Sequence, residues 1–137
     1  MIQRIQSVYL FIAAIAAMLV LFLPLAIIKA TEETAKDPII ATEYVPLMII
    51  GFLMVTFSLG AVFLYANRIV QMKVGWVGIA AGMAFVAFFA NLHGDDFSNM
   101  QFTAGSGMPI LFLIMLFLAI RSINKDHKLV KSADRFR

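Results

Sequence analysis

Long apolar stretches alternate with short polar segments along the chain. Four stretches have no charged residue in their interior: 7–28, 46–66, 74–92 and 108–120. A membrane-spanning helix needs about 20 mostly apolar residues to cross about 30 Å of hydrocarbon. Three stretches reach or approach that length. The fourth stretch is shorter, but it can still cross the membrane if the side chain of Arg121 at its end extends its charge to the interface. The pattern therefore predicts four transmembrane helices.

Short connections between successive apolar stretches favour antiparallel neighbours. We therefore expect one all-α, polytopic membrane domain over 1–137, with four helices in an antiparallel bundle and an amphipathic C-terminal helix on the cytoplasmic side. The predicted helices are 5–28, 44–67, 74–92, 107–123 and 124–135. The first stretch is too long for a signal peptide and lacks a cleavage site, so an uncleaved helix is expected.

Composition agrees with this fold and excludes some chemistry. The chain is 62% hydrophobic and 14% charged, outside the range of ordinary soluble domains. It contains no cysteine, which excludes disulfides, thiol catalysis and cysteine metal sites.

The charges are unequally divided between the connecting segments. If both termini and segment 67–73 share one side, that side holds nine of the eleven basic residues, and the other holds six of the eight acidic ones. Positive segments stay cytoplasmic. The sequence therefore predicts an inner-membrane protein with both termini in the cytoplasm. Tyr9, Tyr65 and Trp76 would lie at the inner interface and Tyr44 at the outer one.

Prolines and polar residues predict how the helices begin and bend. Pro24 should kink the first helix in its outer third. Thr42 is the expected cap of the second helix, with Pro46 in the first turn, and Ser106 the expected cap of the fourth, with Pro109 in the first turn. Segment 38–45 is compatible with a short hairpin over the outer face.

The third apolar stretch carries a row of glycines. Gly75, Gly78 and Gly82 follow the spacing i, i+3 and i+7, which places them on one helix face. Such a face allows close helix packing, because lipid gives no hydrophobic drive for association. It could serve a homodimer. Packing against another helix of the same chain is favoured, since three such helices are available.

The spans contain little that could carry chemistry. Thr56 and Ser58 are almost their only polar interior residues, so a transport path through a single copy is not expected. His127 beside Asp126 lacks a nucleophile and oxyanion donors, so no enzymatic role follows. We expect no cofactor.

One polar loop was considered as a metal site. Its carboxylates, imidazole and amide could gather around a divalent cation: Asn91, His93, Asp95 and Asp96. The spacing matches no metal-binding signature, and a solvated turn is the preferred interpretation.

The C-terminal segment is basic on one helical face. On a helical wheel, the basic side chains of 121–135 cover an arc of about 120°, beside a narrow apolar stripe of Leu129, Ala133 and Phe136. Three interpretations remain open. The charges could have no role beyond fixing the topology, the helix could lie on anionic lipid, or the helix could bind a cytosolic protein. Nucleic acid is not an expected partner, because more charge and interleaved aromatics would be needed.

Three stretches resemble a known family: "MIQRIQSVYL", "YANRIVQMK" and "AIRSINKDHKLVKSADRFR". They are similar to the small four-helix inner-membrane proteins of Bacteroidota grouped as domain of unknown function 4293. The resemblance implies location and architecture and carries no activity. It also marks polar positions that recur in the family's motifs, with Gln3 and Gln6 among them. We take the others as candidate cytoplasmic interaction residues: Arg4, Asn67, Arg68, Gln71, Asp126, Ser132, Asp134 and Arg135.

Opposite charges on the same predicted side of the membrane suggest a specific contact. Arg4 or Arg68 could pair with Asp126 or Asp134 at the inner interface. The expected function is a non-enzymatic accessory or scaffold that contacts membrane lipid or a protein partner through its basic cytoplasmic face. The alternative is a transporter or channel subunit that works only as a homo-oligomer, using Thr56, Ser58 and the glycine face. A lipid-active enzyme would require metal at loop 93–96.

Overall fold

The computed structural model describes residues 2–28, 38–92 and 100–134, and within them the fold is a bundle of four helices. The helices are α1 (Ile2–Phe22), α2 (Val45–Phe63), α3 (Arg68–Leu92) and α4 (Ala104–Asp134). All four are long and apolar enough to cross a membrane, which confirms the predicted all-α polytopic class. Three short strands and one 3-10 turn accompany them: β1 (Pro24–Ile28), β2 (Pro38–Ile40), β3 (Met100–Phe102) and η1 (Ala41–Glu43).

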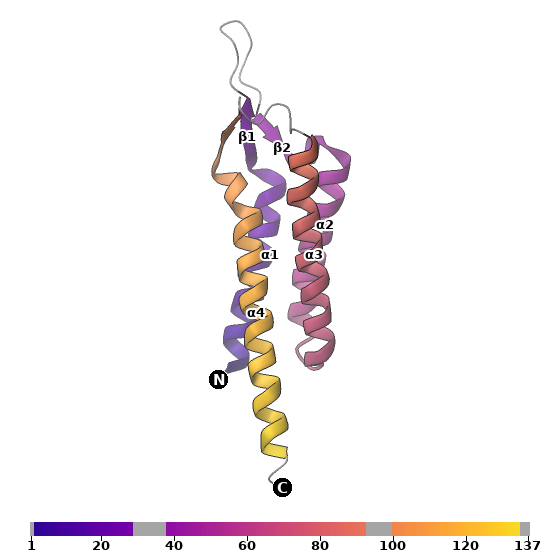
Figure 1. Cartoon of the computed structure of the whole chain (residues 1–137), viewed down its shortest axis with the longest axis vertical. Coiled ribbons are helices and arrows are strands. Elements are labelled where there is room, and N and C mark those ends of the chain that lie inside the picture. Colours follow the sequence, from indigo (N-terminus) through magenta and orange to yellow (C-terminus); the bar gives the residue numbers. More distant parts are fainter. Residues whose placement is uncertain (1, 29–37, 93–99, 135–137) are drawn as a thin grey trace, which may run out of the picture.

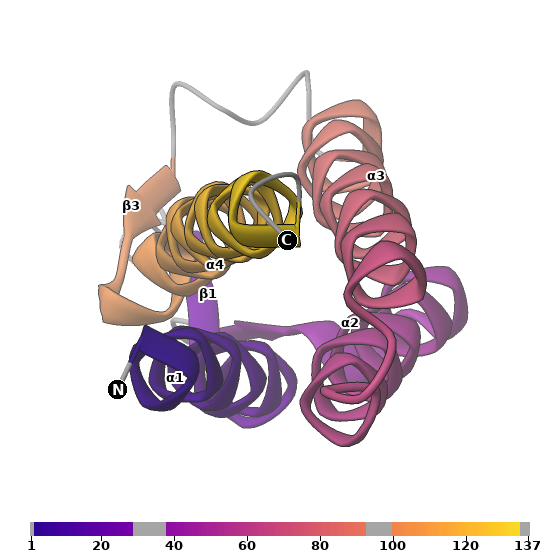
Figure 2. The same cartoon turned by 90° about the horizontal axis from the view of Figure 1, so that it is seen from below.

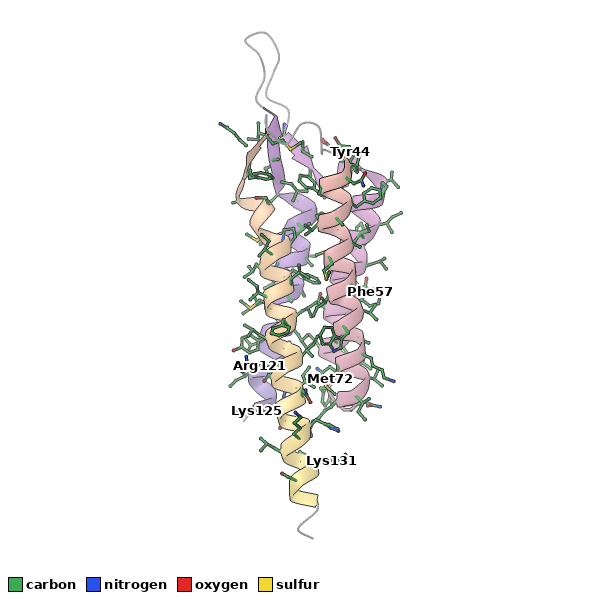
Figure 3. The ribbon with its side chains drawn as sticks, in the orientation of Figure 1. Tyr44, Phe57, Met72, Arg121, Lys125 and Lys131 are labelled. Carbon is green, nitrogen blue, oxygen red and sulfur yellow. The ribbon has the colours of Figure 1, made fainter. Side chains whose placement is uncertain are left out.

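The helices follow the order α1, α4, α3, α2 around the bundle, and neighbours run antiparallel (Figures 1 and 2). We call the end with the start of α1 and the end of α4 the terminal end, and the opposite end, which carries the strands, the sheet end. Tyr44 lies at the sheet end and Lys125 near the terminal end (Figure 3). The two chain termini therefore share one end of the bundle, as predicted.

The first predicted helix, 5–28 with a kink at Pro24, is wrong in its last turn. α1 ends at Phe22, and Pro24 begins β1. Proline has no N–H to donate and its ring crowds the carbonyl four residues before it, so the helix stops. Two other strands then form hydrogen bonds with the backbone of β1, and these bonds hold the residues after Pro24 in an extended conformation.

β1 is the central strand of a small antiparallel sheet in the order β2–β1–β3. Pro24 pairs with Ile40 of β2, and Ala26 pairs with Phe102 of β3. The hairpin suggested for 38–45 is correct only in part. Residues 38–40 form a strand whose partner is β1, and Ala41–Glu43 form the 3-10 turn.

Three helices begin earlier than predicted, since α1 begins at Ile2 and not at 5, α3 at Arg68 and not at 74, and α4 at Ala104 and not at 107. α2 ends earlier than predicted, at Phe63 and not at 67. α3 begins at Arg68 rather than at residue 74, directly after a tight turn in which the Asn67 N–H donates to the Leu64 carbonyl. The Tyr44 side chain makes no capping bond to α2, although it occupies the cap position predicted for Thr42, and Pro46 lies in the first turn as expected.

α4 begins earlier than predicted, at Ala104, so Ser106 lies inside the first turn and does not precede it. The Ser106 hydroxyl donates to the carbonyl of Thr103, the residue at the helix boundary. Pro109 consequently lies in the second turn, inside the helix. Thr103 also holds this end of α4 to the sheet, since its N–H donates to the Leu25 carbonyl at 3.2 Å.

The segment predicted as a C-terminal helix at 124–135 is helical through Asp134, as the last part of α4 and not as a separate helix. α4 continues unbroken from Ala104 to Asp134 (Figure 1). The sequence between Ile110 and Asp134 contains neither glycine nor proline, so nothing in it stops a helix.

The bundle interior is built from small and aliphatic side chains together with Phe85 and Phe112, while many other large apolar side chains face outward. α1 buries Ala13, Ala17 and Val20 at the centre, while Phe11 on α1 and Phe52 on α2 are exposed. In water such an apolar exterior would cause aggregation. In a bilayer it faces lipid chains of the same polarity, as expected for membrane spans.

Candidate functional site

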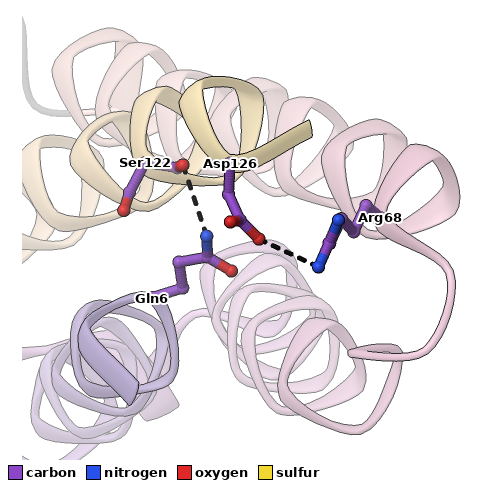
Figure 4. Close-up of polar contacts among 4 residues, drawn as sticks. All are labelled: Gln6, Arg68, Ser122 and Asp126. Carbon is purple, nitrogen blue, oxygen red and sulfur yellow. Dashed lines mark hydrogen bonds and ion pairs between the residues drawn. The ribbon is translucent and has the colours of Figure 1, made fainter. Parts of the chain in front are cut away.

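Most of the buried polar side chains lie together at the terminal end. Gln6 of α1, Gln71 of α3 and Asp126 of α4 are only 4%, 3% and 8% exposed, respectively. With Arg68 they form what we call the polar layer, and Figure 4 shows Gln6, Arg68 and Asp126 of this layer. Buried polar groups must be paired to offset their desolvation, so the contacts within this layer decide what it does.

An ion pair joins α3 to α4. Arg68 Nη2 lies 3.1 Å from Asp126 Oδ2, and the two side chains are 23% and 12% exposed. This is one of the four pairings that charge and shared side suggested. The contact has the distance of an ion pair but not the geometry of a hydrogen bond, so Asp126 Oδ2 has no hydrogen-bond donor among the described residues. The attraction is therefore mainly coulombic.

Two glutamine side chains join the other helices through backbone carbonyls. Gln6 Nε2 donates to the Ser122 carbonyl of α4 at 3.3 Å, and Gln71 Nε2 donates to the Ala61 carbonyl of α2 at 2.9 Å. Both acceptors belong to helical backbone, so their positions are fixed. The polar layer thus ties α1 to α4, α2 to α3, and α3 to α4 at one level of the bundle.

The glycine face of α3 packs against α4 of the same chain. A Cβ on Gly75 would lie 2.9 Å from Ile120, one on Gly78 would lie 3.0 Å from Leu116, and one on Gly82 would lie 2.8 Å from Leu113. These distances are shorter than normal contacts, so the two helices approach as closely as they do because side chains are missing here. The glycine face of α3 is thus occupied by side chains of α4 from the same chain.

Beyond the polar layer α4 continues without a neighbouring helix (Figures 1 and 3). Every residue from Lys128 to Ser132 is exposed, after the buried Asp126. At 1.5 Å per residue, the part from Asp126 to Asp134 extends about 12 Å. We call residues 127–134 the α4 extension. It continues α4 in the same direction and does not turn aside from the helix axis (Figure 1).

The candidate interaction residues divide into two groups. Asn67, Arg68, Gln71 and Asp126 meet at the terminal end, where Asn67 Oδ1 accepts from the Val70 N–H at 3.4 Å in the first turn of α3. Ser132 lies further along the α4 extension, with its hydroxyl bonded to the Leu129 carbonyl of its own helix at 2.8 Å. The remaining candidates have side chains outside the described residues: Arg4, Asp134 and Arg135.

Gln6 is the member of the polar layer that was missed as an interaction residue. Its signal in the sequence is an amide side chain directly before the first apolar stretch, which begins at residue 7. A glutamine at such a depth needs a partner, and that requirement alone could have singled it out.

The two polar residues inside the spans bond within their own helix. Thr56 and Ser58 donate to the carbonyls of Phe52 and Met54, four residues back in their own helix. Within 2–28, 38–92 and 100–134, no group of three or more His, Asp or Glu is placed to hold a metal. His93, Asp95 and Asp96 of the suggested metal loop lie outside the described residues.

Comparison with known proteins gives one match. The profile of a family described as "Domain of unknown function (DUF4293)" matches residues 2–136, nearly the whole chain. No curated protein and no solved structure matches the chain.

Proposed function

This chain belongs to the DUF4293 family, a domain of unknown function, and we propose that it is a non-enzymatic scaffold of the inner membrane. In this proposal the terminal end faces the cytoplasm and the α4 extension binds an acidic surface of a cytosolic protein. The bundle anchors the extension, and the polar layer fixes the place where it leaves the membrane.

Charge supports the orientation. Every Lys and Arg with a described side chain lies toward the terminal end: Arg68, Lys73, Arg121, Lys125, Lys128 and Lys131. Positive residues beside membrane spans stay cytoplasmic. Tyr65 in the turn between α2 and α3 and Tyr44 at the start of α2 lie at opposite ends of the bundle, and both have the amphipathic side chain that favours a membrane interface.

The observation that carries the proposal is the exposure of the α4 extension. It presents Leu129 and Val130 between lysines, and all of these side chains are exposed. Its position is fixed, because Arg68 and Gln6 hold α4 immediately before the extension begins. A preorganised helix with apolar anchors and basic neighbours suits a groove with acidic edges, since little conformational entropy is lost on binding.

The experiment is site-specific photo-crosslinking in the native membrane. A photoreactive residue replaces Leu129 in one variant and the lipid-facing Phe11 in another. The scaffold proposal expects a discrete protein adduct from position 129 and none from position 11. The combined variant K125E/K128E/K131E should abolish the adduct, while K125R/K128R/K131R should retain it.

Two outcomes would contradict the scaffold. One is crosslinking to lipid alone from position 129, and the other is an adduct that survives the charge reversal. Circular dichroism of both lysine variants checks that the helix persists.

The structure gives the channel-subunit alternative less support. Thr56 and Ser58 donate to their own helix, and the glycines that a channel would use are packed against α4. Ion flux through purified protein in proteoliposomes would revive it.

A further inference from the structure

A cavity of about 280 Å³ opens between α3 and α4 at the sheet end. Leu25 of β1, Phe85 of α3 and Pro109 of α4 are buried at its inner side, and the exposed Val86 and Ile110 stand at its mouth. Figure 2 shows the reason, since α3 and α4 lie further apart at this end than at the terminal end.

A second hollow of about 340 Å³ lies between the same pair of helices, nearer the terminal end, lined by Trp76 and Met83 of α3 and by Leu113 and Phe117 of α4. We call the cavity and this hollow together the groove. On α3 the lining residues 76, 79, 83, 86 and 90 are spaced by three or four, so they form one helix face. That face is about 21 Å long at 1.5 Å per residue.

The lining of the cavity favours hydrocarbon over water. None of its lining residues is charged, and its one hydroxyl, on Ser106, donates to the Thr103 carbonyl at 2.7 Å. A water molecule needs two to four polar partners, and apolar cavities of even about 150 Å³ stay dry and bind apolar molecules.

We propose that this cavity binds one acyl chain of a bilayer phospholipid from the leaflet at the sheet end. The mouth is continuous with the lipid-facing surface of the spans, because Val86 and Ile110 belong to both. The chain enters sideways between α3 and α4 and continues along the groove toward Met83. A helix of a second copy, about 10–12 Å across, is too wide for a cavity of this volume. This site is at the opposite end from the α4 extension and is independent of the scaffold proposal.

Native mass spectrometry of the full chain, purified in mild detergent, tests the site. We expect one retained phospholipid per chain. Ala90 lines the cavity, whereas Ala87 is exposed on the same helix and does not. The variant A90F should lose the retained lipid, because its ring fills the space, and the control A87F should keep it. Equal retention by A90F and A87F would overturn the proposal.

A second measurement needs no variant and so does not depend on A90F folding. Wild-type protein is reconstituted with a phospholipid whose acyl chain carries a diazirine at its middle, and the adducts are mapped after illumination. Adducts concentrated on 85–90 and 109–110 support the site. Adducts distributed over all spans according to exposure, on Phe11 and Phe52 as much as on Val86, would overturn it. Retention of an isoprenoid in place of phospholipid would also overturn it.

Discussion

Arg68 and Asp126 bring opposite charges from two helices into a site that is mostly shielded from water. Neither charge has another ionic partner among the described side chains, so each depends on the other. Removing one partner of a buried pair costs about 3–5 kcal/mol, because the remaining charge is left uncompensated. Arg68 keeps some access to water, which reduces that cost.

We therefore expect R68A and D126A each to lower the free energy of unfolding by about 1–3 kcal/mol. The double variant should lose less than the sum of the two, because no unpaired charge remains. A double-mutant cycle in denaturant titrations of the reconstituted protein measures this coupling. Additive losses would show that the pair contributes no coupling. The variant D126N is the control, because it removes the charge and keeps the size and shape of the side chain.

Gln71 makes a weaker contact of a different kind. Its Nε2 donates to the Ala61 carbonyl, and side-chain hydrogen bonds between membrane helices average about 0.6 kcal/mol in double-mutant cycles. Q71M should therefore destabilise the bundle by about 1 kcal/mol or less, clearly less than D126A. The same unfolding measurement ranks the two variants, and a larger loss for Q71M would contradict the ordering of these contacts.

At the scale of the elements, the glycines differ in what surrounds them, and this predicts an order of effects. A Cβ on Gly60 meets nothing within 4 Å, one on Gly82 meets Phe112 and Leu113, and one on Gly105 meets the backbone carbonyl of Pro24. Side chains can shift, whereas the backbone of β1 is held by strands on both sides.

Alanine substitution should therefore cost least at Gly60, with a change below about 1 kcal/mol. G82A should cost about 1–3 kcal/mol, and G105A about 3 kcal/mol or more, because overpacking forces the neighbours to move. Thermal unfolding in one detergent gives the order, with G60A as the control. If G105A proved as stable as G60A, the close approach of α4 to β1 would be wrong.

Local patterns were sufficient to predict the four helices, but the strands depend on distant pairing. Each helix follows from an uninterrupted apolar run, and the unbroken α4 follows from the absence of helix breakers. β1 reads as the end of a helical run, because Leu-Ala-Ile-Ile is equally apolar in either structure. Its strand form depends on β3, which lies far away in sequence and has no apolar alternation of its own.

The same distinction applies to the candidate site. The Arg68–Asp126 pair could be predicted from charge sign and shared side. The contact from Gln6 to the Ser122 carbonyl could not, because it depends on the exact register between α1 and α4. Backbone carbonyls are present at every residue, so sequence gives no indication of which one a side chain will reach.

At the scale of the whole molecule, the two ends of the bundle match the two boundaries of a membrane. Gln6 contacts Ser122 in the polar layer, and Gly105 lies against Leu23 and Pro24 at the sheet end. The α4 backbone between Gly105 and Ser122 spans about 25 Å at 1.5 Å per residue, close to the hydrocarbon thickness of about 30 Å. In a membrane crossed by α4, this length would bring the polar layer and the sheet to opposite interfaces, where polar groups can reach headgroups and water.

This arrangement makes orientation measurable, since the chain has no cysteine to remove. Glu43 is exposed at the sheet end and Lys131 is exposed on the α4 extension. In intact spheroplasts a membrane-impermeant maleimide should label E43C, whereas K131C should react only after the membrane is disrupted. The reason is that the proposal places the positive terminal end in the cytoplasm. F52C, on the lipid-facing side of α2, is the control and should stay unreactive in both conditions, because maleimides require a hydrated thiolate. The reverse pattern would overturn the cytoplasmic assignment of the α4 extension, and with it the scaffold proposal. Labelling of both E43C and K131C from outside would contradict the antiparallel bundle itself.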